Sequence, residues 1–135
     1  MIEQISHLCF SCKDINVTKK FYTKILKFKV VHEFRNFKDN KLYGIYFFIG
    51  KNTFIEFFQD KQTKFKVNNQ FRHFCLKVKN LEKFKRYLKK YKIILTLKRG
   101  RTDNTLQSFI RDPNEILIEL HEYDKKSKFF VLQKK

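Results

Sequence analysis

The sequence predicts an α+β fold built from two tandem β-α-β-β-β modules, each forming a curved sheet or half-barrel that carries one helix. Its 135 residues suit one compact domain and are too few for two ordinary ones. Residues 6–15 and 72–81 share one pattern: His, apolar, Cys, apolar, any two residues, Lys, Asp or Asn, and then Ile or Leu. Residues 54–57 also match residues 117–120. The first match has an offset of 66 residues and the second an offset of 63 residues. Such internal repetition indicates a duplicated module.

The first module begins with a strand at residues 4–11, which are rich in apolar, β-branched and aromatic side chains. Asp14 is the expected N-cap of the helix that follows, because its carboxylate accepts from free N–H groups of a first turn. The apolar stripe of this helix recurs every four residues and comprises Val17, Phe21 and Ile25, with Tyr22 and Leu26 beside it. Strands are then predicted at residues 29–34, 43–49 and 53–58, with a polar turn at 36–40 and a hairpin at 50–52.

The second module repeats this order, with Asn80 as the helix N-cap. Its helix stripe comprises Leu81, Phe84, Leu88 and Tyr91, and its strands are predicted at residues 72–78, 93–98, 105–110 and 116–122. The expected organisation is a single domain at 1–123: module one at 1–58, a polar linker at 59–70 and module two at 71–123. A basic tail at 124–135 carries an apolar patch at 129–132, which packs on the domain, packs on a partner or is disordered.

Composition narrows the classes of function. The net charge of +18 favours anionic small molecules as ligands. The lysines are spread along the whole chain, and the scarcity of Gly and Pro beside abundant Phe and Lys indicates a compositional bias, so no nucleic-acid partner is expected. No apolar run reaches the roughly 18 residues of a membrane span, so no membrane partner is expected. The absence of a signal-like start and the odd count of three cysteines predict free thiols and a cytoplasmic location.

The repeats place one histidine and one glutamate in each module. These residues are His7 and Glu56 in the first module, and His73 and Glu119 in the second. Neither small module can bury its apolar face alone, so we expect the two to pair about a pseudo-twofold axis and bring these side chains toward one cleft. Two imidazoles and two carboxylates form a suitable first shell for a divalent metal, namely Ni²⁺, Zn²⁺, Co²⁺, Mn²⁺ or Fe²⁺.

Other residues that could carry chemistry lack this repetition. His32 and His121 have no echo and are interpreted as structural, although His121 shares the Glu119 face of its strand and is a candidate second-shell residue. The Cys-x-x-Cys of residues 9–12 has the spacing of a redox dithiol. However, the second module has a cysteine at the position of Cys9 and a valine at the position of Cys12. This pattern favours the interpretation that both cysteines are small apolar strand residues.

Residues 109–120, Phe-Ile-Arg-Asp-Pro-Asn-Glu-Ile-Leu-Ile-Glu-Leu, resemble the F-x-x-D-P-x-G-x-x-I-E-L signature of the vicinal-oxygen-chelate superfamily. His7 followed by Asp14 and by an F-Y-x-x-x-L stretch at 21–26 also resembles the start of that family. The superfamily contains glyoxalase I, bleomycin-resistance proteins, fosfomycin-resistance enzymes, methylmalonyl-CoA epimerase and extradiol dioxygenases. The resemblance covers nearly the whole chain, up to residue 123.

The resemblance implies that His7, Glu56, His73 and Glu119 are the metal ligands, and the presence of all four favours members similar to glyoxalase I. In such members, the metal holds two vicinal substrate oxygens and stabilises an enediolate, while a glutamate moves the proton. Glu119 is then the general base, and Glu56 stays on the metal or shares that role. The implied activity resembles that of lactoylglutathione lyase, acting on a hemithioacetal of a 2-oxoaldehyde and a thiol, and a homodimer is expected.

The sequence departs from the family pattern at three positions. Glu115 stands where the signature has glycine, so a tight turn must accept a side chain. Ser11 and Asp60 replace the arginine and asparagine of bacterial relatives that use glutathione, which argues against glutathione as the thiol. Arg99 and Arg101 are the candidates for contacts with an anionic substrate instead.

Two alternatives are kept. One is a metal-free protein of the same fold that binds a small molecule or sequesters an antibiotic. The other is a metal-dependent thiol transferase acting on an electrophilic antibiotic. The presence of Glu56 argues against this second alternative.

Overall fold

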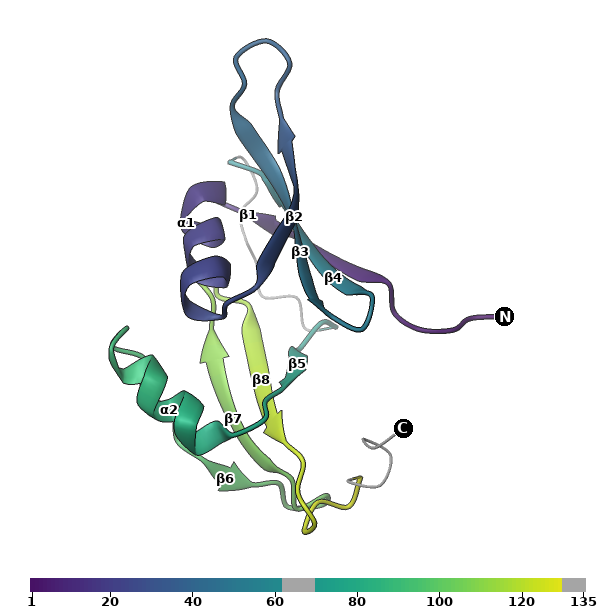
Figure 1. Ribbon diagram of the computed structural model, residues 1–135, viewed down its shortest axis with the longest axis vertical. Helices are drawn as coiled ribbons and strands as arrows, with labels where there is room; N and C mark the ends of the chain where they lie inside the picture. The colour runs from purple at the N-terminus through teal and green to yellow at the C-terminus, as the bar shows by residue number, and fades with distance from the viewer. Residues whose placement is uncertain (62–69, 130–135) are drawn as a thin grey trace. The chain divides into compact units, whose positions relative to one another are not determined.

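The computed structural model describes residues 1–61 and 70–129 (Figure 1). The chain divides into two compact units, Met1–Lys66 and Val67–Lys135. Their boundary falls within the linker predicted at 59–70, of which residues 62–69 lie outside the described part, as do residues 130–132 of the predicted apolar patch.

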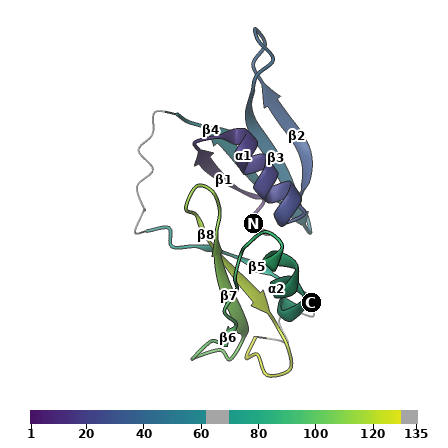
Figure 2. The same ribbon diagram turned by 90° about the vertical axis from the view of Figure 1, so that its left-hand side faces the viewer.

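The first unit contains one four-stranded sheet and one helical segment. Its elements are β1 (His7–Cys12), α1 (Ile15–Lys20), the π-helix η1 (Phe21–Ile25), β2 (Lys29–Arg35), β3 (Leu42–Gly50) and β4 (Thr53–Gln59). The strand order is β1-β4-β3-β2. β1 runs parallel to β4, and the other neighbouring strands are antiparallel. The helix α1 packs on β3 and β4, along one face of the sheet (Figure 2).

The second unit repeats this topology. Its elements are β5 (Phe74–Lys77), α2 (Leu81–Lys89), β6 (Lys98–Arg99), β7 (Leu106–Arg111) and β8 (Leu117–Glu122). The strand order β5-β8-β7-β6 corresponds to that of the first sheet, and β5 is again parallel to β8. The predicted α+β fold of two β-α-β-β-β modules is therefore confirmed, with two open sheets.

Both predicted N-caps are confirmed. The Asp14 carboxylate accepts from the backbone N–H groups of Asn16 and Val17 at 2.8 and 3.0 Å. The side-chain oxygen of Asn80 accepts from the backbone N–H of Lys83 at 2.7 Å. Each cap therefore satisfies donors that the first helical turn leaves without intrahelical partners.

A second helix-end contact recurs in both units and was not predicted. The N–H of Ile15, the first residue of α1, donates to the side-chain oxygen of Gln59 at 3.0 Å. The N–H of Leu81, the first residue of α2, donates to the Glu122 carboxylate at 2.6 Å. Gln59 and Glu122 each end the last strand of their unit, so this hydrogen bond ties the helix start to the strand that carries the predicted glutamate.

The helix stripe predicted for the first unit is partly wrong, because Val17 is 49% exposed. Phe21 and Tyr22 face the core as predicted, and Ile15 and Thr18 join them there in place of Val17. Thr18 is accommodated there because its hydroxyl donates to the Asp14 carbonyl at 2.8 Å, which satisfies the polar atom. The period of four is therefore wrong in its first turn, at Val17, and right at Phe21.

The strand predicted at residues 93–98 is wrong for most of its length, because only Lys98–Arg99 pairs with a neighbour. The segment keeps the alternation that motivated the prediction, with Leu95 buried and Ile94 83% exposed. The Thr96 carbonyl, however, accepts from the Ser108 hydroxyl at 3.0 Å. A side chain of β7 thus occupies an acceptor that a sheet ladder would use.

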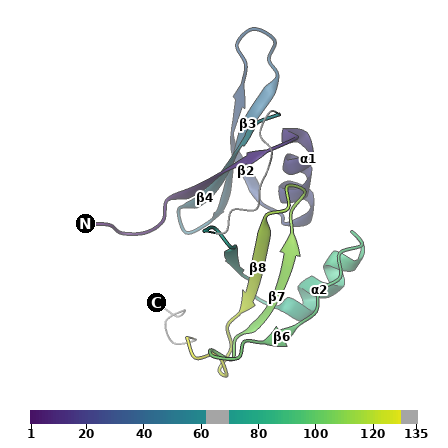
Figure 3. The same cartoon turned by 180° about the vertical axis from the view of Figure 1, so that it is seen from behind.

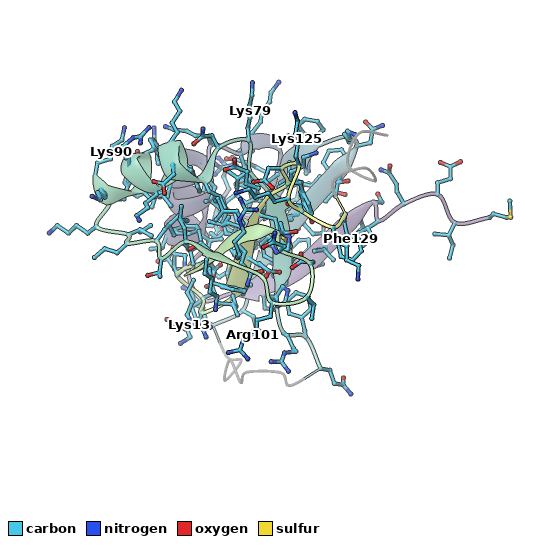
Figure 4. All side chains as sticks on the ribbon, turned by 90° about the horizontal axis from the view of Figure 1, so that it is seen from below. Lys13, Lys79, Lys90, Arg101, Lys125 and Phe129 are labelled. Atoms are coloured by element: carbon cyan, nitrogen blue, oxygen red, sulfur yellow. The ribbon has the colours of Figure 1, made fainter. Side chains whose placement is uncertain are left out.

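The start of the tail packs on its own unit. Ser127 is buried, and the Lys128 N–H donates to the Asp103 carbonyl at 2.8 Å. Basic side chains lie around the outside of the second unit, as Lys79 and Arg101 illustrate (Figure 4). None of the helices in the described residues is long and apolar enough to cross a membrane.

Candidate metal centre

The register of the first sheet brings the predicted first-module ligands onto one face. β1 and β4 pair so that Cys9 lies opposite Glu56, and β3 places Tyr46 on the other side of Glu56. Alternation along β4 buries Ile55 and Phe57 in the core, so Glu56 points to the opposite face of the sheet. The helix therefore covers one face, and the candidate site occupies the other.

His7 and Glu56 approach each other on that face. The His7 Nε2 lies 3.5 Å from the Glu56 Oε1, with side chains 44% and 16% exposed. The His7 ring meets the Tyr46 ring edge-on, with centroids 5.8 Å apart. Burial raises the pKa of the Cys9 thiol to about 11, and its hydrogen bond to Glu56 and the negative charge of that carboxylate act in the same direction.

The second sheet repeats the arrangement with a shorter contact. Cys75 lies opposite Glu119, and Phe109 of β7 lies on the other side of Glu119. The His73 Nε2 is 2.9 Å from the Glu119 Oε2, with side chains 36% and 12% exposed. The His73 ring meets the Phe109 ring edge-on at 6.1 Å.

The two units therefore hold equivalent side chains at corresponding register positions. Figure 3 shows the strands that carry them from behind. The aromatic residues Tyr46 and Phe109 are 63 residues apart, as Glu56 and Glu119 are. The structure brings the four predicted ligands together as two His–Glu pairs, one within each unit. An imidazole nitrogen beside a carboxylate oxygen is a donor set that suits divalent first-row metals.

His121 belongs to this site, although the sequence interpretation left it structural. Its Nε2 lies 3.0 Å from the Glu119 Oε1, and its Nδ1 lies 3.1 Å from the Tyr123 hydroxyl. The Nε2 atom is buried, yet it forms no hydrogen bond of acceptable geometry with the described residues. The Glu119 carboxylate thus has an imidazole at each oxygen, from His73 and from His121.

Cys75 was also missed as a candidate ligand. The ligand atoms of Cys75, Glu119 and His121 all lie within 4.8 Å of one another. Burial raises the pKa of the Cys75 thiol to about 12, and the charge of Glu119 adds to this shift. Strand alternation could have found both residues, because Cys75 follows His73 by two positions and His121 follows Glu119 by two.

The two arginines predicted to contact an anionic substrate occupy different environments. The Arg99 guanidinium forms a two-pronged ion pair with Asp124, including a 3.0 Å hydrogen bond between Nη1 and Oδ1. This guanidinium holds the pKa of the Asp124 carboxyl well below its usual range. Arg101 is exposed in the turn that follows. Arg99 would have to exchange its partner to bind a substrate, whereas Arg101 is open to solvent.

The signature loop before β8 is organised by a buried aspartate. The Asp112 Oδ1 accepts from the N–H groups of Asn114 and Ile116 at 2.8 and 2.9 Å. Glu115, at the position where the signature has glycine, adopts a left-handed conformation with φ of 65°. The turn therefore keeps the left-handed geometry that glycine favours, and Glu115 adopts it at the cost of backbone strain.

Comparison with known proteins agrees with this fold. Residues 4–120 match the model of the Glyoxalase/Bleomycin resistance protein/Dioxygenase superfamily, and the chain belongs to that family. No curated protein matches the chain.

Solved structures show the same fold at low sequence identity. A glyoxalase family protein from Enterococcus faecalis is 24% identical with a TM-score of 0.73, covering 89% of this chain and 98% of its own. A glyoxylase/bleomycin resistance protein/dioxygenase domain from Frankia sp. EAN1pec is 16% identical with a TM-score of 0.72, covering 93% and 95%. A lactoylglutathione lyase from Agrobacterium tumefaciens is 14% identical with a TM-score of 0.68, covering 90% and 95%.

Proposed function

We propose that this protein is a metal-dependent lyase or isomerase of the glyoxalase type, which transfers a proton next to the carbonyl of a small anionic hemithioacetal or a related substrate. The observation that supports the proposal is the duplicated His–Glu pair, at 3.5 Å in the first unit and 2.9 Å in the second. The proposal includes one divalent cation, Ni²⁺, Zn²⁺, Co²⁺, Mn²⁺ or Fe²⁺, held by His7, Glu56, His73 and Glu119. The bound cation supplies Lewis-acid stabilisation of negative charge on the substrate oxygens.

Glu119 is the proposed general base. Its carboxylate is 12% exposed and has an imidazole at each oxygen, from His73 and from His121. A carboxylate within reach of the substrate carbon takes the proton to form the enediolate and returns it to the neighbouring carbon. Glu56 is 16% exposed and interacts with a single imidazole, which suits a residue that remains a ligand or shares the proton.

The partners and compartment follow from the same proposal. The net charge of +18 favours an anionic substrate, and Arg101 is exposed to contact one. The three cysteines are free, which suits a reducing cytoplasm. We also propose a homodimer, because the helix of each unit covers only one face of its open sheet. A monomer mass from size-exclusion chromatography with light scattering would contradict this proposal.

An activity assay tests the proposal. Protein loaded with Mn²⁺ or Ni²⁺ is mixed with methylglyoxal and either glutathione or another low-molecular-weight thiol, and thioester formation is followed. We expect thioester formation with at least one of the thiols. In Glu119→Gln, we expect kcat to fall by at least about 100-fold. His32→Ala is the matched control, because His32 lies in the same sheet two strands away from Glu56 and packs edge-on against Phe34 at 4.6 Å. Unchanged turnover in Glu119→Gln would contradict the assigned base.

A metal-free binding protein is the second candidate, and one observation favours it. Tyr46 and Phe54 stack with centroids 5.1 Å apart and an interplanar angle of 12°, on the face that carries Glu56. Such a surface suits an aromatic or cationic ligand. This candidate predicts thermal stabilisation by such ligands and no response to Ni²⁺ or Zn²⁺; stabilisation by the metals alone would exclude it.

A further inference from the structure

We propose that Cys75, Glu119 and His121 form a Zn²⁺ site contained within the second unit and separate in composition from the four-residue centre. The proposal goes beyond the function above and shares only Glu119 with it. All three residues come from β5 and β8, whose register is defined without reference to the first unit. The site therefore requires neither His7 nor Glu56.

The geometry needs little adjustment to hold a cation. The candidate ligand atoms lie within 4.8 Å of one another. Zinc bonds of about 2.0–2.3 Å in a tetrahedron place ligand atoms about 3.3–3.8 Å apart, so the side chains close by about 1 Å. The His121 Nε2 and Glu119 Oε1 are already 3.0 Å apart. Three protein ligands leave the fourth position for water or a small molecule.

The protonation pattern of His121 also suits a ligand. Its Nδ1 lies 3.1 Å from the Tyr123 hydroxyl, so an N–H at Nδ1 has an acceptor there. In the tautomer that carries its proton on Nδ1, Nε2 offers a lone pair, and this buried atom lies 3.0 Å from a carboxylate oxygen and has no hydrogen-bond partner in the described residues. Two acceptors at that distance repel each other unless a proton or cation lies between them. A histidine whose second ring nitrogen is held by a neighbouring group is the usual arrangement at zinc sites.

The thiol sets the metal preference. A thiolate selects soft or borderline ions such as Zn²⁺ and Co²⁺, whereas Mn²⁺ and Mg²⁺ prefer oxygen ligands. The corresponding row of the first unit has Cys9 and Glu56, but position 58, which corresponds to 121, is a phenylalanine. The first unit therefore lacks the third ligand, and Cys9 serves as a matched control for Cys75.

Cobalt substitution tests the site in the full-length, metal-free protein. Co²⁺ is added and the near-ultraviolet thiolate-to-cobalt charge-transfer band is recorded, and Zn²⁺ affinity is measured by competition with a chelator. We expect the band in the wild type and in Cys9→Ser, and its loss in Cys75→Ser. Cys75→Ser and His121→Gln should each weaken Zn²⁺ binding at least tenfold, and Tyr123→Phe, which removes a positioning residue, should weaken it about tenfold.

The outcomes separate this site from the four-residue centre. The double variant His7→Ala/Glu56→Gln should keep the charge-transfer band, because it leaves the second unit intact. The proposal would be overturned if the wild type showed no charge-transfer band, if the band remained in Cys75→Ser, or if it disappeared in Cys9→Ser. Failure of this proposal does not contradict Mn²⁺ binding by the four-residue centre, because that centre contains no thiolate.

Discussion

Replacing Glu115 by glycine and by alanine measures the strain held in the signature turn. Glu115 has a φ of 65°, which costs a residue with a Cβ about 1–2 kcal/mol. Glycine avoids that cost but loses about 0.5–1 kcal/mol more backbone entropy on folding than alanine does. The glycine variant should therefore be more stable than the alanine variant by about 0.5–1 kcal/mol, the reverse of the order at an ordinary position.

The comparison isolates the backbone strain, because the glycine and alanine variants lose the same side-chain contact and keep the same backbone hydrogen bond. Its carboxylate lies 3.8 Å from the Arg111 Nε, between side chains that are 77% and 53% exposed, and both variants lose this contact. The Glu115 carbonyl keeps its 2.8 Å hydrogen bond from Arg111, because that bond is to the backbone. Thermal and urea denaturation give the difference, about 2–3 °C in Tm. An alanine variant at least as stable as the glycine variant would refute the assigned strain.

Two further predictions concern ionisable groups. Asp124→Asn should lower stability at pH 7, because Arg99 depresses the folded-state pKa of this carboxyl. The loss should shrink as pH falls below about 4, because the carboxyl of the unfolded wild type takes up a proton there while the folded one stays charged. An equal loss at pH 7 and pH 3 in urea titrations would contradict this prediction. In metal-free protein, Glu119→Gln should speed alkylation of Cys75 at pH 8, since it removes a charge that raises the thiol pKa toward about 12. Peptide mapping separates Cys75 from Cys9, whose rate should stay unchanged, and an unaltered Cys75 rate would contradict the prediction.

The parts of the fold that the sequence predicted are those with local or repeated signals. Asp14 and Asn80 cap helices as expected, because a capping residue acts within its own turn. The matched His and Glu positions of the two modules come together in pairs because strand register repeats with the sequence. The left-handed turn at Glu115 was expected from the signature.

The parts that the sequence did not predict depend on tertiary contacts. Thr18 replaces Val17 in the core because its hydroxyl finds a backbone acceptor. Of the strand predicted at 93–98, only its end at Lys98 pairs with β7, and the Thr96 carbonyl accepts from the Ser108 side chain. His121 has no repeated partner, so repetition excluded it from the ligand set. Strand alternation placed it on the Glu119 face, and the 3.0 Å approach of its Nε2 to Glu119 shows that it belongs to the site.

The proposed function requires that ligands from both units, of one chain or of two partner chains, hold one cation. A double-mutant cycle with Mn²⁺ tests this requirement most directly. Mn²⁺ is chosen because it prefers carboxylate and imidazole ligands to thiolate. Titration followed by the electron paramagnetic resonance of free Mn²⁺ should give one site per chain, weakened strongly by His7→Ala and by His73→Ala. The double variant should lose far less than the sum of the two single losses, because the residues act on the same ion. Two sites per chain, or two losses that add, would show that each His–Glu pair binds by itself and would contradict the claim.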